Sequence, residues 1–164
     1  MKKRYTFVLM LILLDIDGVM VPTTTWKPTE ILSDGFAHFS VRAINSLQTI
    51  IDSTGATILL TTSHKSRFNK SQWEEIFKTR GIVASIDVLE NNEDNLNRKE
   101  EILRWFTKTT TSKSFVILDD DKSLNGLPHY IKDKAIVTSG TVGLTINQAN
   151  DAIEMLRKEK FVIA

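Results

Sequence analysis

The chain of 164 residues contains no cysteine, only three histidines and almost no net charge. The absence of cysteine excludes disulfide bonds and zinc sites built from thiolates. The histidines, at positions 38, 64 and 129, do not have the spacing of metal ligands. A net charge of +1 gives no strong overall attraction to nucleic acid or to a membrane surface. With 41% apolar and 25% charged residues the composition is that of an ordinary globular protein, and we expect one domain over residues 1–164.

The chain also lacks an apolar stretch long enough to cross a bilayer. The basic start, MKKR, precedes an apolar run from Phe7 to Leu14, which is the pattern of a secretory signal. However, the run ends at Asp15 without a cleavage site of small residues. We therefore interpret it as a central strand buried on both faces, and expect a cytoplasmic protein with no membrane partner.

Two aspartates follow this run directly. Residues 15–19 read DIDGV, and side chains alternate along an extended chain, so Asp15 and Asp17 point the same way. Gly18 allows the backbone to turn away from them. Because ligands of open α/β sheets bind at the carboxyl ends of strands, this position favours a site for a divalent cation and a phosphate group.

Strand and helix patterns alternate along the rest of the chain, which predicts parallel strand pairing with right-handed crossovers. We expect a three-layer α/β/α sandwich with about five parallel strands. Irregular residues 20–40 form a flap-like insertion and are too few for a folded cap. The expected strands are residues 7–14, 56–60, 82–89, 114–118 and 134–137. The expected helices begin after Ser40, at a capping box that starts with Ser71, at Arg98, and at a capping box that starts with Thr145.

A parallel sheet brings all its carboxyl strand ends to one edge. That edge would collect Asp15, Asp17, Thr61, Thr62 and the acidic run at 119–121. Carboxylates that crowd one pocket take up protons or hold a cation. Oxygen ligands without cysteine or histidine favour Mg²⁺.

These motifs, in this order, resemble those of the haloacid dehalogenase (HAD) superfamily of phosphohydrolases. Its four motifs correspond here to DIDGV at 15–19, the strand and hydroxyl run ILLTTS at 58–63, a cation at Arg98 or Lys99, and VILDDD at 116–121. A closer similarity is to the small capless HAD domain of "Swiss army knife" RNA-repair proteins. It extends to RKEEI at 98–102, Trp105 and GLT at 143–145. The chain departs from that pattern at residues 64–65, where His-Lys replaces the frequent Trp-Arg.

The resemblance implies a Rossmann-like HAD fold and a Mg²⁺-dependent phosphomonoesterase that works through an aspartyl-phosphate. Asp15 would be the nucleophile and a metal ligand. Asp17 would be the general acid and base and would offer its backbone carbonyl to Mg²⁺. The other implied roles are phosphate binding by Thr61 or Thr62 and by Arg98 or Lys99, metal binding by Asp119 and Asp120, and helix capping or outer support by Asp121.

Two other functions fit parts of the sequence. A receiver-like phosphoacceptor domain also combines Mg²⁺ with a phosphorylated aspartate, but its phosphoacceptor would follow the third strand, where only Asp87 stands. A catalytically inactive HAD-fold binding module would retain the fold without turnover.

The expected substrate is a phosphorylated small molecule, such as a nucleotide, or a nucleic-acid end, because an open site admits either. Another subunit of a homo-oligomer could also close such a site. Five cations near the second motif form a candidate basic rim: Lys65, Arg67, Lys70, Lys78 and Arg80.

Overall fold

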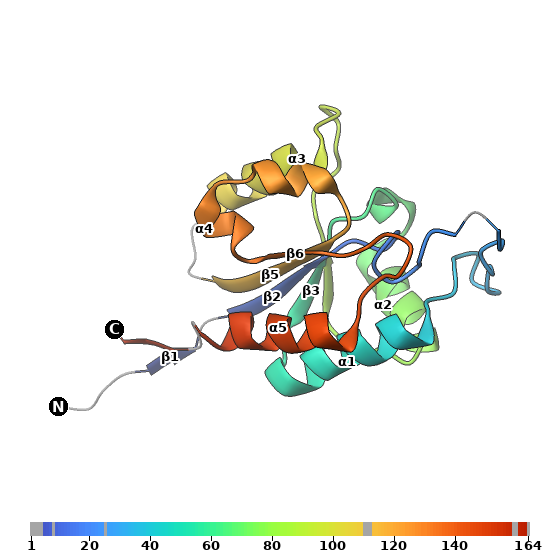
Figure 1. Ribbon diagram of the computed structural model, residues 1–164, viewed down its shortest axis with the longest axis horizontal. Coiled ribbons are helices and arrows are strands. Elements are labelled where there is room, and N and C mark those ends of the chain that lie inside the picture. Colours follow the sequence, from blue (N-terminus) through green and yellow to red (C-terminus); the bar gives the residue numbers. More distant parts are fainter. Residues whose placement is uncertain (1–4, 8, 25, 110–112, 159–160, 164) are drawn as a thin grey trace.

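The computed structural model describes residues 5–7, 9–24, 26–109, 113–158 and 161–163 (Figure 1). At its centre lies a five-stranded parallel sheet with the order β4-β3-β2-β5-β6. The strands are β2 (Leu9–Leu14), β3 (Thr57–Leu60), β4 (Ile86–Val88), β5 (Lys113–Asp119) and β6 (Ala135–Val137). The predicted α/β fold with about five parallel strands is confirmed, and β2 is the central strand.

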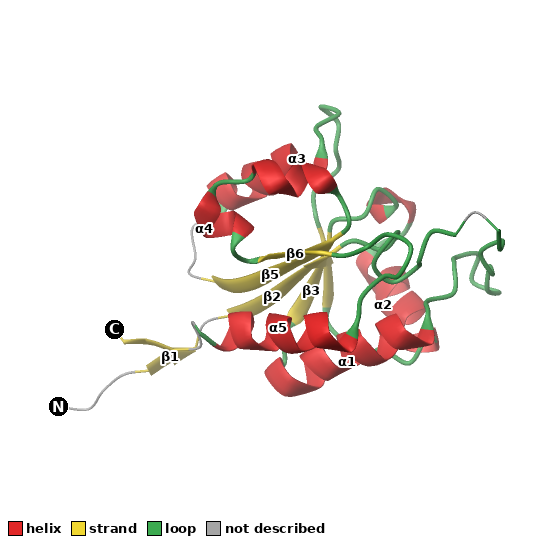
Figure 2. Ribbon diagram, viewed as in Figure 1, coloured by secondary structure: helices red, strands yellow, loops and turns green. Residues whose placement is uncertain are grey.

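Helices cover both faces of this sheet and make three layers (Figure 2). One core is formed with α1 (Val41–Thr54), α2 (Lys70–Thr79) and α5 (Ile146–Arg157). The other is formed with α3 (Arg98–Lys108), α4 (His129–Lys132) and the 3₁₀ helix η2 (Lys122–Gly126). In β2, Ile12 and Leu14 pack into the first core and Leu11 and Leu13 into the second, so the apolar run is buried on both faces.

Three helix starts were predicted from capping residues, and one of them is wrong. Ser40 caps α1, and the Thr145 capping box begins α5, both as expected. Helix α2, however, is capped by Asn69, whose side chain and that of Gln72 form the reciprocal bonds of a capping box. Ser71 therefore lies inside the first turn. The box that forms starts two residues before the predicted one.

Two predicted strands are shorter than expected by two residues or more. Phe7 belongs to a separate strand, β1 (Tyr5–Phe7), which pairs antiparallel with β7 (Phe161–Ile163) in a two-stranded ribbon. Hydrophobicity does not indicate where a chain leaves one sheet for another, and the ribbon was not predicted. In the 82–89 segment only β4 forms a strand, and it pairs with Ile58 to Leu60 of β3.

The longest connection is the segment between β2 and α1, which includes the flap-like insertion predicted at 20–40. Its only regular pairing in the described residues consists of isolated bridges, Asp17 to Val21 and Ile31 to Ala37. The described residues of this segment form no folded cap domain. Within the described ranges, no helix combines the length and the apolar character needed to cross a membrane.

Candidate active site

The backbone hydrogen bonds of the sheet continue one residue beyond β2 and β3 and fix the floor of the site. The amide of Asp15 donates to Leu118 (3.0 Å), and the amide of Thr61 donates to Leu14 (2.9 Å). The side chains of Leu13 and Leu59 face the α3 layer. Because side chains alternate, Asp15 and Thr61, each two residues later, extend toward that same layer.

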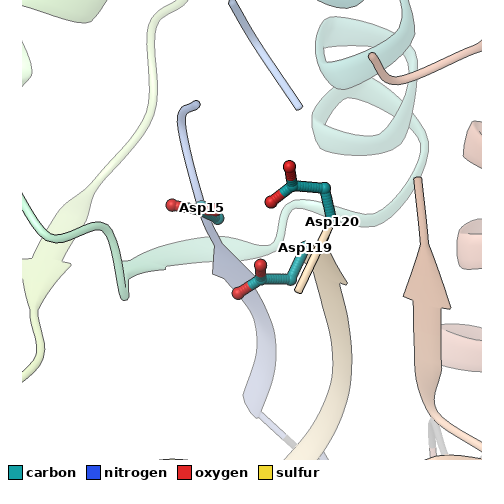
Figure 3. Close-up of side chains that lie close together, drawn as sticks. All are labelled: Asp15, Asp119 and Asp120. Atoms are coloured by element: carbon teal, nitrogen blue, oxygen red, sulfur yellow. The ribbon is translucent and has the colours of Figure 1, made fainter. Parts of the chain in front are cut away.

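Three carboxylates meet at this edge (Figure 3). Asp15, Asp119 and Asp120 each place an oxygen within 4.8 Å of the others. Asp119 is fully buried and Asp15 is only 6% exposed. Residues about a hundred positions apart therefore share one small acidic site, at the place where the sequence predicts it.

Arg98 supplies the positively charged side chain of this site. It stands at the first position of α3, and its Nε lies 2.9 Å from Oδ2 of Asp119 and its Nη2 3.4 Å from Oδ1 of Asp15. The Lys99 side chain instead lies against Gly126 of η2, so the geometry favours Arg98 for phosphate binding. With one guanidinium and three carboxylates in the site, two negative charges remain uncompensated when all three carboxylates are ionised.

Burial and mutual repulsion change how the acids titrate. Burial raises the pKa of Asp15 to about 8; the facing Asp119 charge adds to the rise, and Arg98 opposes it. Burial also raises the pKa of Asp119, again against the effect of Arg98. In the absence of a cation, the pair therefore retains protons at pH values where exposed carboxyl groups have lost theirs.

The donor set fits a magnesium ion. All three side chains offer oxygen, and a divalent cation matches the two uncompensated charges. The backbone leaves room for the third carboxylate: Gly18 has φ of +79°, and a Cβ there would overlap the carboxylate of Asp120. A Cβ on Gly140 would also crowd that carboxylate, at 2.9 Å from its Oδ2. Two glycines thus make the space in which Asp120 joins the site.

The two threonines after β3 differ in their bonding. Both are fully buried. The Thr62 hydroxyl accepts a hydrogen bond from the His64 amide (3.2 Å), whereas the Thr61 hydroxyl has no hydrogen-bond partner among the described residues. A buried hydroxyl without a partner is costly, so this one is suited to an oxygen of a bound ligand. The geometry favours Thr61 over Thr62 for phosphate binding.

Asp17 lies apart from the three-carboxylate cluster. Its side chain is 51% exposed, and its Oδ2 lies 2.8 Å from Nε2 of His64. Sequence reasoning assigned no chemical role to His64. No residue pattern indicates this contact, because the two residues are 47 positions apart and meet only through the fold.

Lys65 was predicted to lie on the basic rim, but its side chain is buried. Its Nζ lies 2.8 Å from Oε2 of Glu101, with both side chains nearly buried, and Oε1 of Glu101 lies 3.5 Å from Nη1 of Arg98. Arg80 likewise is buried against Asp34. The predicted basic rim is therefore wrong at two of its five members, which are buried in ion pairs inside the fold, whereas Arg67, Lys70 and Lys78 are exposed.

The remaining motif residues support the site from outside. Asp121 caps η2 by accepting from the Ser123 amide (2.8 Å), in agreement with the capping role expected of it. In the GLT stretch, Gly143 has φ of +80° and approaches the carbonyl of Val19, and Leu144 is fully buried. Through this contact, the stretch before α5 packs against the loop that carries Asp17.

A comparison with curated proteins finds no match for this chain. A family model, described as the HAD domain in Swiss Army Knife RNA repair proteins, matches residues 11–149, which include β3 to β6, most of β2 and all the site residues above. The chain therefore belongs to this family of HAD domains, a family of the phosphohydrolase type.

Proposed function

We propose that the protein is a Mg²⁺-dependent phosphomonoesterase that forms an aspartyl-phosphate on Asp15. The observation that carries the proposal is the cluster of Asp15, Asp119 and Asp120, with Arg98 against two of the three. The membership in a HAD family supports it.

Two residues near Asp15 would bind the phosphoryl group. The Arg98 guanidinium and the Thr61 hydroxyl would each bind a phosphoryl oxygen. Mg²⁺, held by the three carboxylates together with the backbone carbonyl of Asp17, would supply the positive charge that lets a phosphate dianion approach an acidic site.

The chemistry then requires two residues. A carboxylate oxygen of Asp15 attacks phosphorus, and the bond from phosphorus to the leaving oxygen breaks. Asp17 gives its proton to that oxygen, so the product leaves as an alcohol. Asp17 next takes a proton from a water molecule that attacks the aspartyl-phosphate, which releases phosphate and restores Asp15.

For the substrate we propose a nucleotide or the phosphorylated end of a nucleic acid. The support is the RNA-repair context in the description of the family and the absence of a folded cap over the described site. Of the predicted basic rim, Lys65 and Arg80 are buried and lend the proposal no support. Residence in the cytoplasm and assembly into a homo-oligomer stay predictions.

The test is turnover of an activated aryl phosphate with Mg²⁺ and with a chelator. We expect steady release of phosphate that needs the metal and is lost in Asp15→Asn. Asp121→Asn is the matched control, because asparagine retains the capping oxygen beside the site. One stoichiometric phosphorylation without turnover would indicate a receiver-like domain, and no reaction would indicate a binding module. Nucleotides, sugar phosphates and 3′- or 5′-phosphorylated oligonucleotides then define the substrate.

A further inference from the structure

The imidazole of His64 is fixed beside Asp17 by several contacts. Its ring packs edge-on against Phe36, with centroids 5.5 Å apart, and its amide donates to the hydroxyl of the buried Thr62. The ring is thereby held against the segment between β2 and α1, which contains both Phe36 and Asp17. It presents Nε2 to Oδ2 of Asp17 at 2.8 Å.

The surroundings of the other ring nitrogen determine which one carries the hydrogen. Nη1 of Arg67 lies 3.5 Å from Nδ1 of His64. A guanidinium can only donate, so Nδ1 is the acceptor of this contact. The hydrogen of the neutral ring is then on Nε2, which donates to Asp17.

We propose that His64 is the positioning residue for Asp17, an inference that rests on the proposed phosphatase function. The bond from Nε2 engages Oδ2, so the proton for the leaving group is carried on Oδ1 of the same carboxyl. Without that bond, a side chain that is 51% exposed would rotate among several orientations. His64 retains its own proton throughout: the Oδ1–H bond breaks, the proton goes to the leaving oxygen, and the P–O bond breaks.

The way in which the rate depends on the leaving group distinguishes this positioning role from a general structural role. A poor leaving group, such as an alkyl alcohol, needs the proton from Asp17, whereas 4-nitrophenolate leaves without it. The measured quantity is kcat/KM over a series of aryl and alkyl phosphates, because kcat/KM includes only the steps up to transfer of phosphorus to Asp15. We expect His64→Leu to lower kcat/KM about tenfold or more for alkyl phosphates, and hardly at all for 4-nitrophenyl phosphate.

Three further variants sharpen the test. His64→Gln retains an N–H donor near the position of Nε2 and should restore most of the alkyl phosphate rate. His129→Leu, at an exposed histidine on α4, should leave all the rates unchanged. In an Asp17→Asn background, His64→Leu should have no additional effect, because His64 acts only through Asp17.

Equal losses on all substrates in His64→Leu, or no loss on any, would overturn the proposal, as would a full additional loss in the Asp17→Asn background. Wild-type turnover of 4-nitrophenyl phosphate tests the phosphatase function separately. If that turnover is absent, both the function and the role of His64 in it are overturned. The ¹⁵N shifts of the imidazole then still report the hydrogen bond itself: a hydrogen on Nδ1 alone would make Nε2 an acceptor and would overturn the predicted donation from His64 to Asp17.

Discussion

Lys65 and Glu101 form an ion pair that is almost completely shielded from solvent, with Nζ 2.8 Å from Oε2 and side-chain exposures of 5% and 6%. The pair joins the loop after β3 to the first turn of α3. Glu101 also faces Arg98, so the same contact helps to hold the cation of the site in place.

Removing one partner of this pair should be far worse than removing both. Lys65→Met leaves a buried carboxylate without its partner and should lower the free energy of unfolding by about 3–5 kcal/mol. Replacing both, with Lys65→Met and Glu101→Leu, should recover most of that loss. Urea denaturation measures the difference, with Lys78→Met on the exposed face of α2 as the control. A single Lys65→Met variant as stable as the wild type would show that the pair does not form.

Gly18→Ala should weaken the proposed metal site as well as strain the backbone. Gly18 and Gly35 have nearly equal φ, +79° and +80°, but a Cβ at Gly35 meets nothing within 4 Å. Both alanine variants incur a conformational cost of about 1 kcal/mol or more. Only Gly18→Ala also displaces the Asp120 carboxylate. Calorimetric titration with Mg²⁺ should therefore show weakened binding in Gly18→Ala and normal binding in Gly35→Ala; equal affinities would contradict this account of Gly18.

The metal-free protein should lose stability as the pH rises from about 4 to about 8. Burial raises the pKa of Asp15 from 3.8 in the unfolded chain to about 8, so across this interval the folded state holds a proton that the unfolded chain has released. The free energy of unfolding therefore falls through this window and levels off above it. Urea denaturation in the presence of a chelator should show this slope, and Asp15→Asn should reduce it.

Magnesium should oppose the fall in the free energy of unfolding at higher pH, because it competes with the proton on Asp15. Its stabilising effect should be larger at pH 8 than at pH 6, and binding near pH 7 should release protons. Calorimetry in buffers of different ionisation enthalpy measures this release. Binding without proton release would mean that Asp15 is already ionised.

The two threonines should respond differently to replacement by valine. Thr61→Val removes a buried hydroxyl that has no partner in the described structure, so stability should be unchanged or raised while phosphatase activity falls. Thr62→Val removes the acceptor of the His64 amide and should lower stability by about 1 kcal/mol. Unfolding curves and aryl phosphate kinetics distinguish the two effects. Activity that survives Thr61→Val and is lost only in Thr62→Val would reverse the assignment.

The fold and the acidic centre could be predicted because each rests on a strong local pattern. The run ending at Leu14 and the strand ending at Asp119 are apolar on both faces, which identifies central strands of a parallel sheet. In such a sheet, the residues after the strands meet at one edge. The convergence of Asp15, Asp119 and Asp120 therefore follows from the topology alone.

The features that escaped prediction depend on contacts between distant residues. Lys65 follows a hydroxyl run at a helix start, which is usually a solvated position, and only the fold brings Glu101 to its Nζ. The contact of His64 with Asp17 has the same origin. The pairing of β1 with β7 joins the two ends of the described chain, and no local pattern indicates it.

The most direct test is a crystal structure with Mg²⁺ and beryllofluoride, which mimics a phosphoryl group on an aspartate. We predict beryllium bonded to a carboxylate oxygen of Asp15 and one Mg²⁺ ion bound by Asp15, Asp119 and Asp120. Arg98 and the Thr61 hydroxyl should contact the fluorine atoms. Beryllium on any other residue, or a metal ion that does not contact Asp119 and Asp120, would contradict the account.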